Sequence, residues 1–532
     1  MKKFQMDHQM FWPILIFLLA VAIPISINPE KGGQILNAVL GFTTSKLGWL
    51  FLAYTIGIFF FLLWLAFGRY GNVKLGEPDD EPEFNYFTWV SMLFCSGIGA
   101  SLIYWSIIEP IYYYQGPPFG IEPGSTVAVE WGAMYGMFHW GFSAWAIYAI
   151  PTLPIAYAMY VRKLPNLRMS TACSGLIGEH SNGIAGKVID TMAMFGIVGG
   201  VATVLGLGVP MIATIMGELF NIQSSFLLQI IVIIIWTGII AVSMWLGLQK
   251  GIAKLANFTV IICLVFVGYV LLVGPTIFIL DLFSNSLGLL LNNFFMMSLW
   301  TDPILKGGFP EGWTVFYWAW WLALAPLMGM FVAKISKGRT IKELVVAELV
   351  WGTLGCWIYF AVFGGYSLHL QINNIIPLAS LLSQSGAPVA ILAVFKSLPL
   401  AGLVLPVVLV IWFVFSGTTF NSAAYTLASG TTKNLEGDEE PVAWFRLLWA
   451  FIIGVVAMAL LAVGSLSAVQ VSSVVLTVPL IPIFIIMIIS FMKWLKEDHG
   501  PALAPVKRGF KYSKTQGVQE QQVNMDGNKI DI

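Results

Sequence analysis

Six residues share one face of a single apolar segment if that segment is an α-helix. They are Trp313, Tyr317, Trp320, Trp321, Leu324 and Met328, and the 3.6-residue helical period brings them into one stripe. At 1.5 Å per residue, Trp320 lies about 10 Å along the helix axis from Trp313, which is too deep for the surface of a membrane. Aromatic ring faces attract a weakly hydrated cation that donates no hydrogen bonds. The stripe therefore predicts one wall of a box for a quaternary ammonium group.

A second aromatic stripe lies in the segment 135–160. Trp140 and Tyr148 are eight residues apart there, and Trp145 precedes Tyr148 by three. Two stripes that face each other would close the box. Its rings would hold the cation of a zwitterion without the help of a protein carboxylate. Full charge pairing with such a carboxylate in a low dielectric would be hard to break. The alternative is a tightly packed Trp-rich core, and most other aromatic residues fit interfacial belts.

The composition places both stripes in a membrane. Of the 532 residues, 58% are hydrophobic and 10% are charged, against about 25% charged in a soluble domain. These values argue against a soluble enzyme, a disordered chain and a nucleic-acid-binding protein. A hydropathy window of about 19 residues predicts twelve spans, near residues 11–28, 47–68, 87–108, 135–160, 189–216, 226–247, 255–276, 313–333, 344–367, 400–428, 442–464 and 466–492.

Two further helices are expected outside these spans. Residues 277–300 contain Asp281 and several Asn and Ser residues, which favours an amphipathic helix at the membrane interface. A short helix is expected near 376–397, before the tenth span.

Basic residues orient the spans. Of the 27 Lys and Arg residues, only Lys31, Lys46, Lys306 and Lys396 fall on one side, and the others lie in the two tails and the loops of the opposite side. The positive-inside rule then predicts a multi-pass protein of the cell membrane with both termini in the cytoplasm. The first segment lacks a small-residue cleavage site, so we expect a retained helix.

Other chemistry is scarce in the sequence. The four cysteines are far apart, without metal or disulfide spacing, and no phosphate-binding glycine loop or acid/base pair is evident. Glu109 and Glu348 are expected near span ends, Asp190 opens the fifth span, and His139 is expected to bond to a neighbouring helix. An enzyme, a proton relay and an ATP-driven pump are therefore disfavoured, and no cofactor is expected.

Two spans contain residues that can break a helix. The third span has Gly97 and Gly99 at mid-depth, and the eighth has Pro326 and Gly329. Close helix packing is the alternative role for the two glycines of the third span. Because the two spans are five apart, spans three to seven and eight to twelve can form two repeats of opposite orientation, each opening with a broken helix.

The expected fold is thus an all-α membrane protein with twelve transmembrane helices. Two leading spans occupy residues 1–86, a first repeat 87–276, the amphipathic helix with a linker 277–312, a second repeat 313–495, and a polar cytoplasmic tail 496–532. The tail is expected to be solvated, and sensing of osmotic conditions or anionic lipids through its lysines is the alternative.

Several motifs resemble those of the betaine/carnitine/choline transporter family. The most specific is Phe316-Tyr-Trp-Ala-Trp-Trp321, which continues to Gly329-Met-Phe-Val-Ala-Lys-Ile-Ser-Lys-Gly-Arg339. The others are Tyr104-Trp-Ser-Ile-Ile-Glu109-Pro110, Phe138-His-Trp140-Gly, Gly247-Leu-Gln-Lys-Gly251 and Asn421-Ser-Ala-Ala-Tyr425. The resemblance covers about residues 8–495. It implies two inverted five-helix repeats of the LeuT type, alternating access and a homotrimer.

The resemblance also implies a substrate site. The central box of the family maps to Trp140, Trp320 and Trp321, with Tyr112 as a further wall, and Trp313 matches an outer, transient site.

The other residues expected at the site resemble two different branches of the family. Trp145 and Tyr148 match box residues of the sodium-coupled betaine branch, in which Leu324 is replaced by an aromatic residue. Met328 matches a methionine that holds the carboxylate side of the substrate in the carnitine/γ-butyrobetaine exchangers. The sequence Phe67-Gly-Arg-Tyr-Gly71 also resembles that exchanger branch most.

Coupling is where the sequence departs from the exchangers. Thr259 stands where they carry an arginine that replaces a sodium ion. A sodium site of the coupled branch would use the Thr418 and Thr419 hydroxyls together with backbone oxygens, which here belong to Phe415, Cys95 and Ile98. The alternative is that both hydroxyls bond to the preceding turn of their own helix.

The expected function is therefore secondary transport of a betaine-type zwitterion, with glycine betaine, carnitine and γ-butyrobetaine as candidates. Sodium-coupled uptake is favoured over sodium-independent exchange of substrate and product. A channel, or a receptor that binds without translocating, is the alternative from another class.

Overall fold

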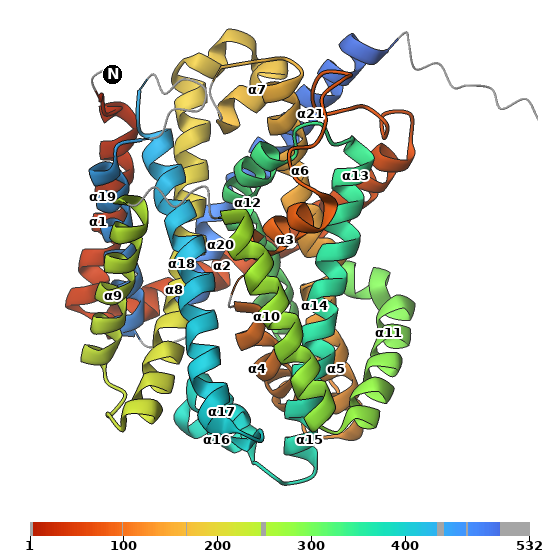
Figure 1. Ribbon diagram of the computed structural model, residues 1–532, viewed down its shortest axis with the longest axis vertical. Coiled ribbons are helices and arrows are strands. Elements are labelled where there is room, and N and C mark those ends of the chain that lie inside the picture. Colours follow the sequence, from red (N-terminus) through yellow and green to blue (C-terminus); the bar gives the residue numbers. More distant parts are fainter. Residues whose placement is uncertain are drawn as a thin grey trace, which may run out of the picture.

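The computed structural model describes residues 4–97, 99, 101–165, 168–245, 252–433, 441–463 and 466–500. Two parts of the predicted sodium site, Ile98 and the side chain of Thr418, lie outside the described residues. Within the described ranges the chain is helical, and its only β pairing is two isolated bridges, Met6 with Thr432 and Lys74 with Thr340. Figure 1 shows the helices in one bundle, with the long helices α8 (Ile184–Phe220) and α18 (Ala401–Gly430) running along it.

The first half of the chain forms ten further helices. They are α1 (His8–Ile27), α2 (Pro29–Phe67), α3 (Tyr86–Gly97), α4 (Ser101–Gln115), α5 (Thr126–His139), α6 (Phe142–Tyr160), α7 (Met169–Ile177), α9 (Phe226–Trp245), α10 (Ile252–Val273) and α11 (Thr276–Leu299).

The second half adds the remaining helices. They are α12 (Val315–Ile335), α13 (Ile341–Val346), α14 (Thr353–Tyr359), α15 (Gly365–Ile372), α16 (Leu378–Ser385), α17 (Ala387–Ser397), α19 (Ala443–Val463), α20 (Leu466–Thr477) and α21 (Leu480–His499). The π-helical turns η4 (Ala347–Gly352) and η5 (Phe360–Gly364) join α13, α14 and α15 into one continuous span.

Length and apolarity identify the membrane spans. Eleven helical segments of the described chain are long and apolar enough to cross a membrane, and the bent pair α3 and α4 raises this number to twelve. The set includes α11, whose interfacial position stays a prediction, whereas the described apolar part of α9 is shorter than a full span. The division of the chain into leading helices, repeats, linker and tail also stays a prediction.

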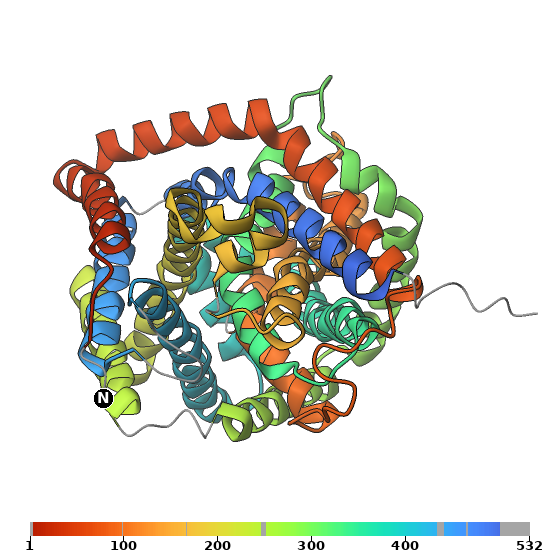
Figure 2. The same cartoon turned by 90° about the horizontal axis from the view of Figure 1, so that it is seen from above.

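Two boundaries differ from the sequence expectation. Helix α2 begins at Pro29 rather than near residue 47, because Asn28 caps the Lys31 N–H and proline favours the first helical turn. In Figure 2 this long helix runs along the rim of the bundle. The short helix expected near 376–397 is present as two helices, α16 and α17, which meet at Gly386 with a positive φ of 83°.

The predicted break in the eighth span is wrong. Helix α12 is continuous from Val315 to Ile335, with Pro326 inside it. Gly329 serves a different purpose, because a Cβ atom there would lie 2.8 Å from the Pro151 ring of α6. A proline removes one backbone hydrogen bond, and the tight contact with α6 stabilises the helix across that gap.

Figure 1 shows the end of the bundle that carries α7 and α21, and several ion pairs lie there. Arg162 forms ion pairs with Glu497 at 2.7 Å and with Asp498 at 2.8 Å. Lys337 pairs with Asp80 at 3.0 Å. The pKa of Asp80 is lowered by the Glu77 backbone N–H and by Lys337. These contacts join the loop after α6 to the end of α21, and the loop before α3 to the loop after α12.

Candidate functional site

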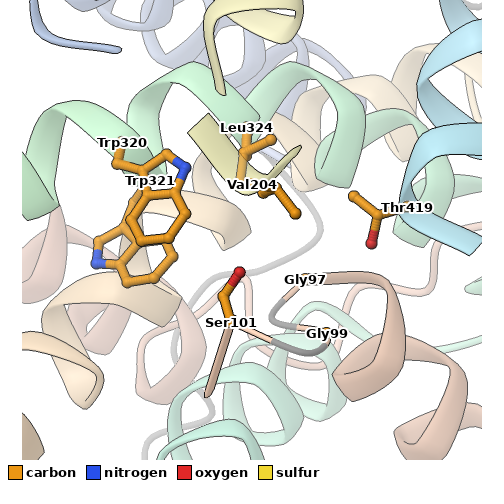
Figure 3. A pocket seen from close by; sticks show the side chains of 8 residues that line it. All are labelled: Gly97, Gly99, Ser101, Val204, Trp320, Trp321, Leu324 and Thr419. Carbon is orange, nitrogen blue, oxygen red and sulfur yellow. The ribbon is translucent and has the colours of Figure 1, made fainter. Parts of the chain in front are cut away.

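A small cavity lies in the middle of the bundle, where α3, α4, α8, α12 and α18 meet (Figure 3). Its volume is about 10 Å³, which is room for about one water molecule. The lining residues are Gly97, Gly99, Ser101, Val204, Trp320, Trp321, Leu324 and Thr419. Three of them, Trp320, Trp321 and Leu324, belong to the stripe predicted from the sequence.

The backbone of the third span is broken at this cavity. Helices α3 and α4 meet at an angle of 60°, and Gly99 between them has a φ of +52°, in the left-handed region that favours glycine. A Cβ atom at Gly97 would lie 2.8 Å from Met328 Cε and 3.2 Å from Tyr148 Cε2. The predicted break is therefore present, and both glycines are required by its geometry.

The tryptophans of α12 form a stacked pair beside the break. The Trp320 and Trp321 rings are 5.1 Å apart and nearly parallel, at 13°. Trp140 meets Trp321 edge-on at 4.7 Å, and Tyr148 meets it edge-on at 5.9 Å. The two predicted stripes thus face each other across α6 and α12, and in Figure 3 the Trp320 and Trp321 rings lie side by side near Ser101.

Backbone oxygens hold the indole N–H groups of that pair. Trp320 donates to the Gly200 carbonyl at 3.2 Å, and Trp321 donates to the His139 carbonyl at 3.0 Å. The His139 carbonyl is at the end of α5, where the chain turns through Trp140 and Gly141 before α6 begins. Both indoles therefore have satisfied N–H groups. Their faces pack on each other and on the Phe316 and Tyr317 rings.

Glu109 of α4 holds the third tryptophan. Its Oε2 accepts hydrogen bonds from Trp140 Nε1 at 3.0 Å and from the Tyr317 hydroxyl at 2.6 Å. Its Oε1 accepts from the Tyr113 hydroxyl and lies 3.3 Å from His139 Nδ1. The carboxyl group is fully buried, and these contacts fix the positions of Trp140 and Tyr317 around it.

Two glutamates expected near span ends, Glu109 and Glu348, have no exposed surface. The partners of Glu109 come from distant segments and were not predicted from the sequence. His139 was correctly expected to contact a neighbouring helix, since its Nε2 lies 3.0 Å from the Thr314 hydroxyl.

Trp313 and Tyr112 form a second aromatic cluster. Their rings are 5.3 Å apart, and Trp313 also contacts Tyr113 at 4.9 Å and Trp105 at 5.9 Å. The structure therefore places Tyr112 beside the predicted outer residue, rather than among the residues that line the central cavity. Tyr317 connects the two clusters, because its ring contacts both Trp313 and Trp321.

Trp145 does not line the cavity itself. It meets Tyr148 edge-on at 5.9 Å and stacks on Phe94 at 6.0 Å. It also packs against Gly352, where a Cβ atom would lie 2.2 Å from the indole. Trp145 thus supports Tyr148, whose hydroxyl donates to the Gly97 carbonyl at 3.2 Å.

The described part of the predicted sodium site is close to the break. The Thr419 side chain lines the cavity, and its Oγ1 would lie 3.4 Å from a Cβ atom at Gly99. The same hydroxyl donates to the Phe415 carbonyl at 3.3 Å, as the alternative expectation had it. Cys95 is buried, and its thiol lies 3.7 Å from the Ala256 carbonyl.

Comparison with known protein families agrees with this geometry. The model of the betaine/carnitine/choline family transporters matches residues 9–500. The chain belongs to this family. It is a multi-pass membrane protein and a secondary transporter of betaine-, carnitine- or choline-type substrates, not an enzyme. The family has the LeuT-type fold with inverted repeats, so the expected fold class is confirmed.

Two residues of the transporter's cavity were not predicted from the sequence. Val204 and Ser101 line it, but a valine within an apolar span and a serine in a small-residue stretch carry no sequence signal for binding. Gly200, one turn before Val204, does carry one: glycines in a span mark close approach. A Cβ atom there would lie 2.8 Å from Leu324.

Proposed function

We propose that this transporter takes up a betaine-type zwitterion together with Na⁺, with glycine betaine, carnitine and γ-butyrobetaine as the candidate substrates. The observation that carries the proposal is the tryptophan cluster beside the broken third span. Trp140, Trp320 and Trp321 are buried, their N–H groups are bonded to the protein, and rings in such a setting bind a desolvated quaternary ammonium group by cation–π attraction.

In the proposed complex the trimethylammonium group lies against these three rings. Tyr148 closes the box, Trp145 supports Tyr148, and Tyr112 and Trp313 form the outer site on the entry path. The substrate carboxylate points to Met328 and to backbone N–H groups of the break, because Met328 packs against Gly97. A cavity of about 10 Å³ is too small for such a ligand, so binding requires the bundle to open, as alternating access does.

The proposed Na⁺ site adjoins the same break. Its ligands are the Thr418 and Thr419 hydroxyls and the backbone oxygens of Phe415, Cys95 and Ile98. Support comes from Thr419, whose side chain shares the cavity with Gly97 and Gly99. Oxygen ligands suit a hard cation, and a broken helix offers carbonyls free of helical hydrogen bonds.

Uptake into proteoliposomes tests the proposal. Purified transporter is reconstituted, and uptake of radiolabelled glycine betaine, carnitine and γ-butyrobetaine is measured with an inward Na⁺ gradient and with Na⁺ replaced by K⁺. At equal pH on both sides, we expect saturable, concentrative uptake of one betaine only with the Na⁺ gradient. Equal uptake in K⁺ rejects the coupling. Binding without uptake indicates a receptor, and currents far above carrier rates indicate a channel.

Sodium-independent exchange of substrate and product is the second candidate. The feature that favours it is Met328, which lies at the break and matches the carnitine/γ-butyrobetaine exchangers. Vesicles preloaded with unlabelled γ-butyrobetaine separate the two functions. An exchanger accelerates carnitine uptake only into preloaded vesicles and does so without Na⁺, whereas a symporter needs no internal substrate.

We also propose a homotrimer with both termini of each chain in the cytoplasm. The basic residues Arg162 and Lys337 form their ion pairs at the end of the bundle that carries α7 and α21. The positive-inside rule assigns an end with basic residues to the cytoplasm. Mass measurement in detergent tests the trimer. Labelling of a cysteine introduced at Lys163 by an impermeant reagent, in intact cells and in inverted vesicles, tests the orientation.

A further inference from the structure

Glu348 is a carboxylic acid buried inside a membrane span. It belongs to the π-helical turn η4, seven residues after α13 begins at Ile341, which is about 10 Å along the axis at 1.5 Å per residue. Its side chain has no exposed surface. By distance and angle, neither of its oxygens receives a hydrogen bond from a described residue.

The surroundings of Glu348 contain little that could balance a charge. Turn η4 packs against α3, α6, α13 and α14. The titratable groups of these helices are Tyr86 and Cys95 on α3, Tyr148, Tyr157 and Tyr160 on α6, Lys342 and Glu343 on α13, and Cys356 and Tyr359 on α14. Lys342 is the cation of this set, and its ammonium group lies 5.4 Å from the centre of the Phe67 ring instead.

Two α6 side chains face the carboxyl group. The Tyr148 hydroxyl interacts with it electrostatically and donates its hydrogen bond to the Gly97 carbonyl. The Thr152 hydroxyl is within hydrogen-bonding reach of the carboxyl group, but it donates to the Tyr148 carbonyl at 2.8 Å. Both hydroxyl protons are therefore engaged elsewhere, so neither stabilises a negative charge on the carboxyl group.

An ionised carboxylate in such a site is unstable, because burial of an unpaired charge costs several kcal/mol or more. A metal cation could balance it only with further oxygen ligands, and no group of three or more acidic, histidine or cysteine side chains in the described chain forms a metal site. A proton needs no such ligands. We propose that Glu348 is a proton-binding site whose occupancy is coupled to substrate transport, an inference that rests on the proposed transport function.

The chemical step is a simple protonation. In the conformation open to water, a carboxylate oxygen takes a proton from hydronium and forms an O–H bond. The neutral acid then persists through the closed conformation described here. When the site opens to the other side, the O–H bond breaks and the proton returns to water. A buried carboxyl group that alternates in this way moves one proton per cycle.

Tyr148 connects this step to the substrate site. Its hydroxyl interacts electrostatically with Glu348 and donates to the carbonyl of Gly97, while its ring contacts Trp321 at 5.9 Å. A negative charge on Glu348 would compete with that carbonyl for the hydroxyl proton, and a neutral acid would not. Protonation therefore stabilises the broken third span in the geometry that closes the aromatic box.

Proton-driven accumulation tests the site. Wild-type transporter and Glu348→Gln are reconstituted in liposomes with equal Na⁺ on both sides, and radiolabelled glycine betaine, carnitine and γ-butyrobetaine are offered in turn. An inside-alkaline gradient of one pH unit is worth about tenfold in accumulation per proton. We expect this gain for wild type and its loss in Glu348→Gln, with betaine binding retained. A gain retained in the variant overturns the inference.

The matched control is Glu343→Gln, on the same span. Glu343 completes a capping box with Thr340, a role that glutamine also performs, so this variant should keep the tenfold gain. Proton counting gives a second measurement that needs no variant. The betaine that the transporter binds is added to unbuffered wild-type protein with a pH indicator. Binding should transfer about one proton per chain between protein and solution, and no such transfer overturns the inference.

These outcomes separate the inference from the function on which it rests. Wild-type protein that transports a betaine without any response to the pH gradient rejects the proton site alone. Wild-type protein that binds none of the three betaines rejects the proposed function.

Discussion

Replacement of Trp321 by leucine tests whether ring faces, rather than packing, hold the substrate. The indole is 1% exposed, stacks on Trp320 and is met edge-on by Trp140. A desolvated ring contributes about 2 kcal/mol to the binding of a cation. At 1.4 kcal/mol per factor of ten, its loss predicts a rise of about 30-fold in the Kd of the betaine.

Trp318→Leu is the matched control for this change. Trp318 is on the same helix and fully buried, but it packs on Phe138 at 5.5 Å and does not line the cavity. Both substitutions remove a similar volume from the protein, so both should cost a few kcal/mol of stability and lower the melting temperature similarly. We expect the Kd of Trp318→Leu to stay within about threefold of wild type, because no cation–π contact is lost.

A ligand of the same shape with an uncharged head group isolates the contribution of the positive charge. In 3,3-dimethylbutanoate a carbon atom replaces the nitrogen of glycine betaine, so the methyl groups remain and the positive charge is lost. Equilibrium binding of both ligands to wild type and to Trp321→Leu forms a cycle that removes the packing contribution. The reasoning is refuted if Trp321→Leu weakens both ligands equally, or if Trp318→Leu weakens the betaine as much as Trp321→Leu does.

Three further substitutions probe the groups around the box. Glu109→Gln replaces the carboxyl acceptor of Trp140 and Tyr317 by an amide. Hydrogen bonds to charged groups are stronger by about 1 kcal/mol, so we expect calorimetry to show about fivefold weaker betaine binding, and unchanged affinity would contradict this role. Gly99→Ala places a side chain at a φ of +52°, which costs about 1–2 kcal/mol, and should slow uptake more than it weakens binding; equal effects on both would argue against a moving break. Thr419→Val should raise the Na⁺ concentration for half-maximal uptake without changing Na⁺-free betaine binding, and an unaltered Na⁺ titration would remove Thr419 from the proposed site.

The aromatic wall could be predicted because helical periodicity is a local property. Trp320, Trp321 and Leu324 share a face of any regular helix, and they line the cavity together. The spans follow from local composition in the same way. The Gly97 and Gly99 break was also predictable, since paired glycines allow the φ of +52° and the close approach of Met328.

Long-range partners could not be predicted in that way. The Glu109 carboxylate binds Trp140 and Tyr317, which are 31 and 208 residues away in the sequence. Hydropathy reports local composition only and contains no information on such partners. Tyr112 shows the same limit, since the rotation of α4 turns its ring toward Trp313, and no sequence period fixes that rotation relative to α12.

The unbroken eighth span changes where movement can arise. Gly329 is pressed against Pro151, so α12 and α6 hold each other as a rigid pair, and Trp321 moves with that pair. The discontinuities beside the cavity lie instead at Gly99, between α3 and α4, and at Gly141, between α5 and α6. Both belong to the first predicted repeat. A substrate carboxylate bound at the break would therefore close a flexible element onto a rigid aromatic wall, which is a direct way for binding to select the closed conformation.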